Sequence, residues 1–241
     1  MNIDWLHEVE ILINLFAQGL GGWLQAPMQA FSFLGTENFY IIIMPALYWC
    51  IDSRLGLRVG IIFLLSNGLN ALLKLAFHTP RPYWVDARVI GFASESGFGL
   101  PSGHSQSAAS VWGLLASSLR KSAVKWGLIA LVVLIGFSRI YLGVHFASDV
   151  LLGWTVGGLL LLVFLRLEKR AAVWAAGRSL NGLLAYIAVS SVLLVGLVLG
   201  MQASLGAWQV PAQWAEQALA KTGAEIDPLN PEGAFTVGGT W

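Results

Sequence analysis

Charged residues are scarce in this chain, where Asp, Glu, Lys and Arg together make up 11% of the 241 residues. A soluble domain carries about 25% charged residues. Hydrophobic residues instead account for 56% of the sequence, and the mean hydropathy is +0.70. This composition excludes an ordinary soluble domain and predicts that a lipid bilayer is the solvent for most of the chain.

Other features are also nearly missing. Cys50 is the single cysteine, which excludes an intrachain disulfide. The net charge of +1 gives no reason to expect nucleic acid as a partner. The N-terminal end has acidic residues where a signal peptide would have basic ones, which argues against a cleaved leader. We find no heptads, internal repeat or low-complexity linker, so residues 1–241 are predicted to form one domain.

Long apolar runs are what the chain does contain. Crossing the hydrocarbon takes about 20 mostly apolar residues in a helix. Six segments meet this need, namely 38–52, 57–77, 103–119, 124–141, 147–166 and 181–201. The sequence therefore predicts an all-α integral membrane protein, a bundle of about six transmembrane helices.

Residues 5–34 have a different pattern. Apolar residues recur there at helical spacing, but Glu8, Glu10 and Gln18 interrupt them, and Gly21 and Gly22 break the run. We predict that residues 1–34 contain two interfacial helices lying along the membrane surface. A seventh span is the alternative.

The distribution of charge between the loops predicts an orientation. Short loops that face the cytoplasm carry an excess of Lys and Arg. Nine of the fourteen basic residues fall in the loops 52–58, 119–126 and 166–180, whereas eleven of the thirteen acids fall on the other side. We therefore expect an inner-membrane protein in which the N-terminus, loops 78–102 and 141–146 and the tail 202–241 face the periplasm or exterior. Within that tail, 212–221 is predicted to be a short interfacial helix, and the apolar run 233–237 is typical of the start of another membrane helix.

Three short polar islands interrupt the apolar runs, and all of them fall on the predicted outer side. Lys74 and Arg81 belong to the first island and Arg139 to the third. Arg presents a planar fork that fits two phosphate oxygens, while Lys acts as a point charge. Each cation alone could be an interfacial anchor. Three on one side, next to two histidines and an aspartate, indicate a phosphate site.

The second island, Pro101-Ser102-Gly103-His104, precedes an apolar helix. Ser102 is a natural N-cap, so the free backbone N–H groups of the first turn should form an anion site. Gly103 allows the backbone to approach the anion closely. His104 lies in the first turn and could reach the same anion. An ordinary capped helix with a surface histidine is the alternative for this island alone.

The third island contains His145 and Asp149, which are four residues apart and would share one face of a helix. A carboxylate bonded to one imidazole nitrogen leaves the other nitrogen free to attack. A buried pair that only packs is the alternative. His104, His145 and Asp149 could also hold a metal ion, but three neighbouring cations would repel it, so no metal or other cofactor is expected.

Taken together, the islands read Lys-x6-Arg-Pro, Pro-Ser-Gly-His and Ser-Arg-x5-His-x3-Asp. This order resembles the signature of the type 2 phosphatidic acid phosphatase superfamily, which includes glucose-6-phosphatases and vanadium haloperoxidases. Every signature position is matched between Lys74 and Asp149, and residues 35–170 would form the catalytic core.

The resemblance implies a role for each residue. His145 would be the nucleophile that forms a phosphohistidine, Asp149 would orient it, and His104 would be the general acid and then the base. The phosphoryl oxygens would be bound by Lys74, Arg81, Ser102, Gly103 and Arg139.

The expected function is therefore hydrolysis of a lipid phosphate or lipid pyrophosphate, with membrane lipids as the surroundings. The alternatives are a phosphotransferase with the same intermediate, a non-catalytic lipid-phosphate binder or transporter, and a phosphatase for a soluble ester. Gly153, Gly157 and Gly158 could serve packing inside the bundle or a homodimer.

Overall fold

The computed structural model describes residues 4–206 and 208–229, and within these ranges all regular elements are helices. Their bounds are α1 Asp4–Gly19, η1 Gly22–Leu24, α2 Gln25–Phe33, α3 Glu37–Cys50, α4 Ser53–Phe77, α5 Pro82–Val85, α6 Gly103–Ser107, η2 Ala108–Trp112, α7 Gly113–Ser118, α8 Ser122–Tyr141, α9 Ala147–Ala176, α10 Leu180–Ser204 and α11 Ala212–Thr222. The predicted all-α class is confirmed. The run 233–237 lies outside the described residues.

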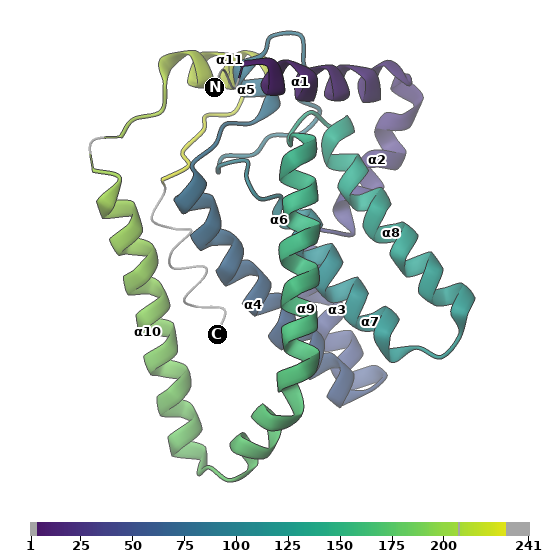
Figure 1. The fold of residues 1–241 in the computed structure, drawn as a ribbon, viewed down its shortest axis with the longest axis vertical. Coiled ribbons are helices and arrows are strands. Elements are labelled where there is room, and N and C mark those ends of the chain that lie inside the picture. The colour runs from purple at the N-terminus through teal and green to yellow at the C-terminus, as the bar shows by residue number, and fades with distance from the viewer. Residues whose placement is uncertain (1–3, 207, 230–241) are drawn as a thin grey trace.

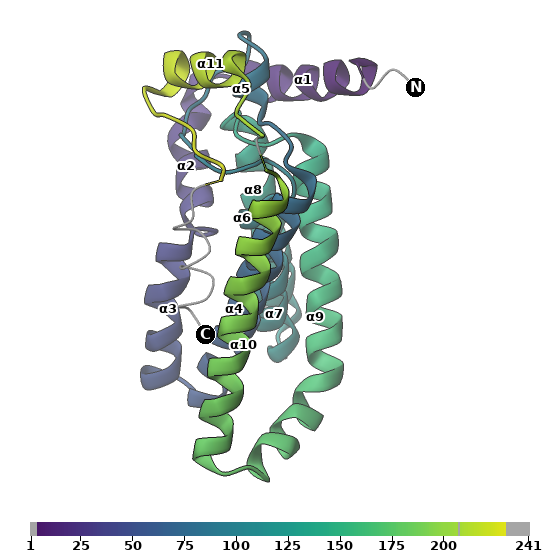
Figure 2. The same cartoon turned by 90° about the vertical axis from the view of Figure 1, so that its left-hand side faces the viewer.

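The long helices run roughly alongside one another, and α1, α5 and α11 cover one end of them (Figure 1). A view from the side shows α1 and α11 lying across that end (Figure 2), and α10 lies at one edge of the bundle (Figure 1). The connections α3–α4, α7–α8 and α9–α10, which carry the excess of basic residues, all lie at the opposite end. The three polar islands therefore share the acidic end of the molecule.

Four helical segments of the described chain are long and apolar enough to cross a membrane: Ser53–Val85, Ser122–Tyr141, Ala147–Ala176 and Leu180–Ser204. The predicted span 38–52 reaches this standard only together with 22–33, from which it is bent by 50°. The structure thus supports four spans, or five with the bent pair, and the expected six are not confirmed.

The predicted span at 103–119 is helical from Gly103 to Ser118 and consists of α6, the π-helical turn η2 and α7 in direct succession. Its first half also buries polar side chains, among them Ser105, Gln106 and Ser110. Gln106 donates to the Ser66 carbonyl at 2.7 Å, and Asn70 donates to Gln106 Oε1 at 2.9 Å. These contacts join the segment to α4 inside the protein, so its polar side chains avoid lipid.

Two of the three glycines of α9 allow close packing inside the bundle. A Cβ at Gly157 would lie 2.3 Å from the Gln106 carbonyl oxygen, and a Cβ at Gly153 would lie 2.7 Å from the Ser102 carbonyl oxygen. The segment from Ser102 to Gln106 can approach α9 only because these positions lack side chains. Gly158 has open space around it, and the homodimer stays a prediction.

The two N-terminal helices differ in direction. Helix α1 lies across the end of the bundle, as expected for an interfacial helix, whereas α2 descends towards α3 (Figure 2). The exposed side of α1 carries Leu12 and Phe16, which are 51% and 72% exposed. In the tail, the predicted helix at 212–221 is confirmed as α11, which lies beside α5, with Trp214 6.1 Å from Trp84 between ring centroids.

Candidate active site

The first island straddles the end of α4. Lys74 is in the last turn of this helix, which stops at Phe77 because His78 adopts a left-handed conformation with φ of 38°. The chain is then extended up to Arg81, and Pro82 begins the short helix α5. Thr79 fixes the following loop beside it, since its side chain accepts from Leu100 N at 3.0 Å and its carbonyl from Gly99 N at 2.9 Å.

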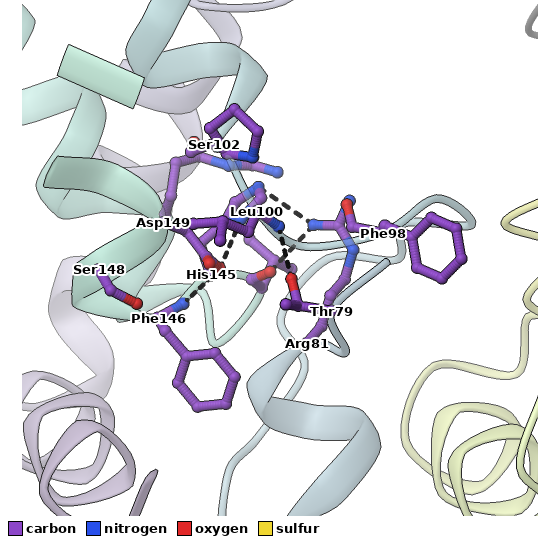
Figure 3. A network of polar contacts seen from close by, with 12 residues as sticks. Thr79, Arg81, Phe98, Leu100, Ser102, His145, Phe146, Ser148 and Asp149 are labelled. Atoms are coloured by element: carbon purple, nitrogen blue, oxygen red, sulfur yellow. Dashed lines mark hydrogen bonds and ion pairs between the residues drawn. The ribbon is translucent and has the colours of Figure 1, made fainter. Parts of the chain in front are cut away.

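The Arg81 side chain is fully buried and all its nitrogens are bonded. Nε donates to the Gly97 carbonyl at 2.7 Å and Nη2 to the Phe98 carbonyl at 3.0 Å. Nη1 donates to the Val144 carbonyl at 2.9 Å and lies 3.1 Å from His145 Nε2. The planar guanidinium thus joins loop 97–100 to the turn that carries His145 (Figure 3).

These contacts determine the tautomer of His145. A guanidinium can only donate hydrogen bonds, so Nε2 must be the acceptor and the proton resides on Nδ1. Nδ1 lies 3.1 Å from Asp149 Oδ2 and donates to it. Arg81 and Asp149 therefore hold the ring from opposite sides, with the Nε2 lone pair directed at the cationic cluster (Figure 3).

Burial, together with the positive charge of Arg81, holds the pKa of His145 well below its usual range. The imidazole is consequently neutral at neutral pH. A neutral ring whose Nε2 carries no proton has the electronic state that a nucleophile needs.

The geometry of the His145–Asp149 pair differs from the expected one. Helix α9 begins at Ala147, so His145 lies in the preceding turn rather than on the helix face. Asp149 reaches it because it lies in the first turn of α9, where the same Oδ2 also accepts from Phe146 N at 2.9 Å. The carboxylate therefore caps the helix and orients the imidazole at once.

The second island lies directly against the third. Ser102 is the N-cap of α6, as predicted, and its Oγ accepts from Ser105 N at 3.4 Å. Its backbone N–H donates to the Asp149 carbonyl at 3.0 Å. A Cβ at Gly103 would lie 3.0 Å from Asn70 Oδ1, so this position approaches α4 closely. Asn70, which the sequence did not single out, also donates to the Pro101 carbonyl at 3.2 Å.

The remaining cations converge on the same place. Arg139 is in the last turn of α8 and is buried. Lys74 and His104 are close enough to Arg81, Arg139 and Glu95 for their charges to interact. All eight residues assigned by the sequence thus lie at one end of the bundle, around the His145 ring.

Glu95 is a member of this site that sequence reasoning did not assign. Its Oε1 forms an ion pair with Arg139, and its Oε2 lies 3.6 Å from Arg81 Nη2. Burial would raise the pKa of Glu95, but Arg139 and Arg81 outweigh that effect and hold this pKa well below its usual range. The carboxylate is therefore an anion that pairs with both of the guanidinium groups predicted to bind phosphate. The signal in the sequence was a single charge within the otherwise uncharged loop 89–100.

Among the residues that the structure describes, no cluster of three or more His, Cys, Asp or Glu side chains could hold a metal ion. Three of the residues were considered for that role. His145 and Asp149 form a hydrogen-bonded pair, whereas His104 lies among the cations.

Fold and site together define a class: an all-helical membrane protein with a cluster of buried cations beside a His–Asp pair. Comparison with known proteins gives the family. A model of the PAP2 superfamily matches residues 55–173. Phosphatidylglycerophosphatase B of Bacillus subtilis is 35% identical over 158 residues, which are 59% of this chain and 73% of that protein. The chain belongs to the PAP2 superfamily, whose signature the islands resembled.

A eukaryotic relative is longer than this chain. Human sphingosine-1-phosphate phosphatase 2 is 32% identical over 136 residues, 54% of this chain and 34% of that protein. Among solved structures, the Bacillus subtilis PAP2-type phosphatidylglycerolphosphate phosphatase has a TM-score of 0.59 at 29% identity, over 70% of this chain and 88% of that one. The relatives described above are lipid phosphatases by name, and this chain is a multi-pass membrane protein of their family.

Proposed function

We propose that this protein hydrolyses a lipid phosphate through a phosphohistidine formed on His145. The observation that carries the proposal is the state of that ring: neutral, protonated on Nδ1 and presenting Nε2 to Arg81. The lipid names of the relatives support a lipid phosphate as the substrate class. A substrate phosphoryl group would take the place of the Glu95 carboxylate on Arg139 and Arg81.

The reaction would proceed in two displacements. The Nε2 lone pair attacks phosphorus, and the bond between phosphorus and the lipid oxygen breaks as His104, protonated when the phosphate anion is bound beside it, donates a proton to that oxygen. His104, now neutral, then accepts a proton from water, whose oxygen attacks phosphorus and breaks the P–N bond to release inorganic phosphate. The Lys74, Arg81 and Arg139 cations stabilise the charge on the phosphoryl oxygens in both steps. A phosphotransferase would differ only in the acceptor of the second step.

Trapping the intermediate tests this mechanism. Rapid acid-free quenching of the full chain with radiolabelled phosphatidate, in EDTA, should give a phosphoenzyme that is stable to base and labile to acid, as a phosphoramidate is. The His145→Asn variant should give no labelled protein, because it lacks the nucleophile. Acid-stable label, or turnover that stops when metal is chelated, would contradict the proposal. Free phosphate as the product excludes transfer to a lipid acceptor.

We also propose that the site faces the periplasm or exterior of the inner membrane. The basic loops at the opposite end of the bundle support this orientation. Cys50, which is exposed at the end of α3 next to the first basic loop, is a native reporter. A membrane-impermeant maleimide should label it in inside-out vesicles and leave it unlabelled in right-side-out vesicles. The reverse pattern would place the site in the cytoplasm.

A further inference from the structure

The buried side of α1 carries a stripe of polar side chains. Glu10, Asn14 and Gln18 are spaced by four residues, so they share one face of the helix. Glu10 is 7% exposed and Asn14 is 0% exposed, while apolar side chains such as Phe16 point outwards. A surface helix usually buries its apolar face alone. Here the protein has turned polar groups inwards, which requires partners for each of them.

Asn14 contacts the segment that carries the nucleophile. Its Nδ2 donates to the Ile140 carbonyl at 2.8 Å and to the His145 carbonyl at 3.1 Å. The first of these oxygens belongs to the last turn of α8 and also accepts from Gly143 N at 3.0 Å. The second belongs to the proposed nucleophile itself. One amide therefore connects the end of α8 to the backbone of His145.

Glu10 and Gln18 hold the two sides of the same turn. Glu10 Oε1 accepts from Ser148 N at 3.0 Å, one of the free N–H groups in the first turn of α9. Gln18 Nε2 donates to the Tyr141 carbonyl at 3.1 Å and to the Ile90 carbonyl at 2.7 Å, and its Oε1 accepts from Ile90 N at 3.1 Å. The three side chains thus bind the backbone before, at and after His145.

We propose that Glu10, Asn14 and Gln18 are positioning residues for the nucleophile: they fix the turn 141–148 so that His145 Nε2 keeps its place in the cationic cluster. The inference rests on the proposed role of His145. Arg81 and Asp149 contact the nitrogens of the His145 ring. Asn14 instead contacts the backbone of His145, and it does so from a helix far away in the sequence. A displacement of 1 Å in a reacting group can cost about 100-fold in rate.

The test compares variants of the full chain in detergent, with a short-chain phosphatidate as the substrate. Asn14→Leu is nearly isosteric and removes the donor, and we expect kcat to fall about fivefold to tenfold while KM stays within twofold, because Asn14 lies behind the turn and not on the phosphate. Glu10→Leu should also lower kcat, and Glu10→Gln should restore most of it because the amide keeps an acceptor oxygen for Ser148 N. Leu12→Ala on the exposed side of α1 is the matched control.

Thermal unfolding of the same variants separates positioning from stability. For a positioning role, kcat falls more in Asn14→Leu than in Gln18→Leu even where their melting temperatures agree, because Asn14 contacts His145 and Gln18 contacts its neighbours Tyr141 and Ile90 instead. Wild-type kcat in Asn14→Leu, or losses of kcat that follow melting temperature alone, would overturn the inference. If Asn14→Leu does not fold, the two Glu10 variants test the inference: a Glu10→Gln variant with a kcat no higher than that of Glu10→Leu would overturn it. Normal turnover in His145→Asn would instead refute the proposed function.

Discussion

Replacing Asp149 with asparagine should lower kcat by about 10³-fold to 10⁴-fold, the loss typical of a buried carboxylate that orients a catalytic histidine. The asparagine oxygen can still accept from Phe146 N, so the start of α9 should be preserved. What disappears is the negative charge beside Nδ1. The imidazole becomes cationic when Nε2 bonds to phosphorus, and His145 and Asp149 are only 1% and 2% exposed, so water cannot replace that charge.

Phosphate release from a short-chain phosphatidate measures this effect, and circular dichroism with thermal unfolding checks that the protein remains folded. His145→Asn sets the lower limit of the assay, because it removes the nucleophile altogether. Asp227→Asn, which removes a carboxylate from an exposed position in the tail, is the matched control. An Asp149→Asn variant that keeps more than a tenth of wild-type kcat would show that the pair only packs.

Replacing Glu95 with glutamine should tighten the binding of inorganic anions between about 10-fold and 100-fold. The substitution removes a charged partner from Arg139 and Arg81, and hydrogen bonds to charged groups contribute about 1.5–3 kcal/mol. An incoming phosphate no longer has to displace a competing carboxylate, whose low pKa keeps it charged throughout the neutral range. Inhibition constants for orthovanadate and phosphate against lipid substrate measure the change.

The matched control is Glu216→Gln, which alters the net charge equally at an exposed position of α11. It should leave the inhibition constants within twofold of wild type. Weaker anion binding in Glu95→Gln would mean that the carboxylate supports the cationic cluster rather than competing for it. In that case Glu95 would hold Arg139 and Arg81 in place for the phosphate, and the variant should also lose its affinity for substrate.

Local patterns in the sequence predicted most of the residues that lie together in the site. The polar islands stood out because charge is expensive in lipid, and the basic loops predicted that the islands would share one end, which the fold confirms. Ser102 was identified as an N-cap from its neighbours alone. The His145–Asp149 contact was expected from the spacing, although the helix begins later than the spacing assumed. Each of these depends on residues close together in the chain.

Glu8, Glu10 and Gln18 show where such reasoning stopped. In the sequence they interrupt an apolar pattern, and nothing local shows that two of them point inwards. Their partners are distant in sequence: Glu10 binds Ser148, and Gln18 binds Ile90 and Tyr141. The predicted span at 103–119 is not confirmed for a related reason, because its polar residues bond to α4 inside the protein.

The sequence by itself determined that this protein lies in a membrane, that it is helical, and which residues gather at one end of the bundle as a predicted phosphate site. Composition and short-range periodicity are sufficient for that, since the lipid solvent penalises every exception. Only the tertiary structure decided the tautomer of His145, the place of Glu95 among the cations and the inward polar face of α1. Those properties depend on which distant segments touch, and a burial cost is offset only where the partner's donor or acceptor is actually in reach.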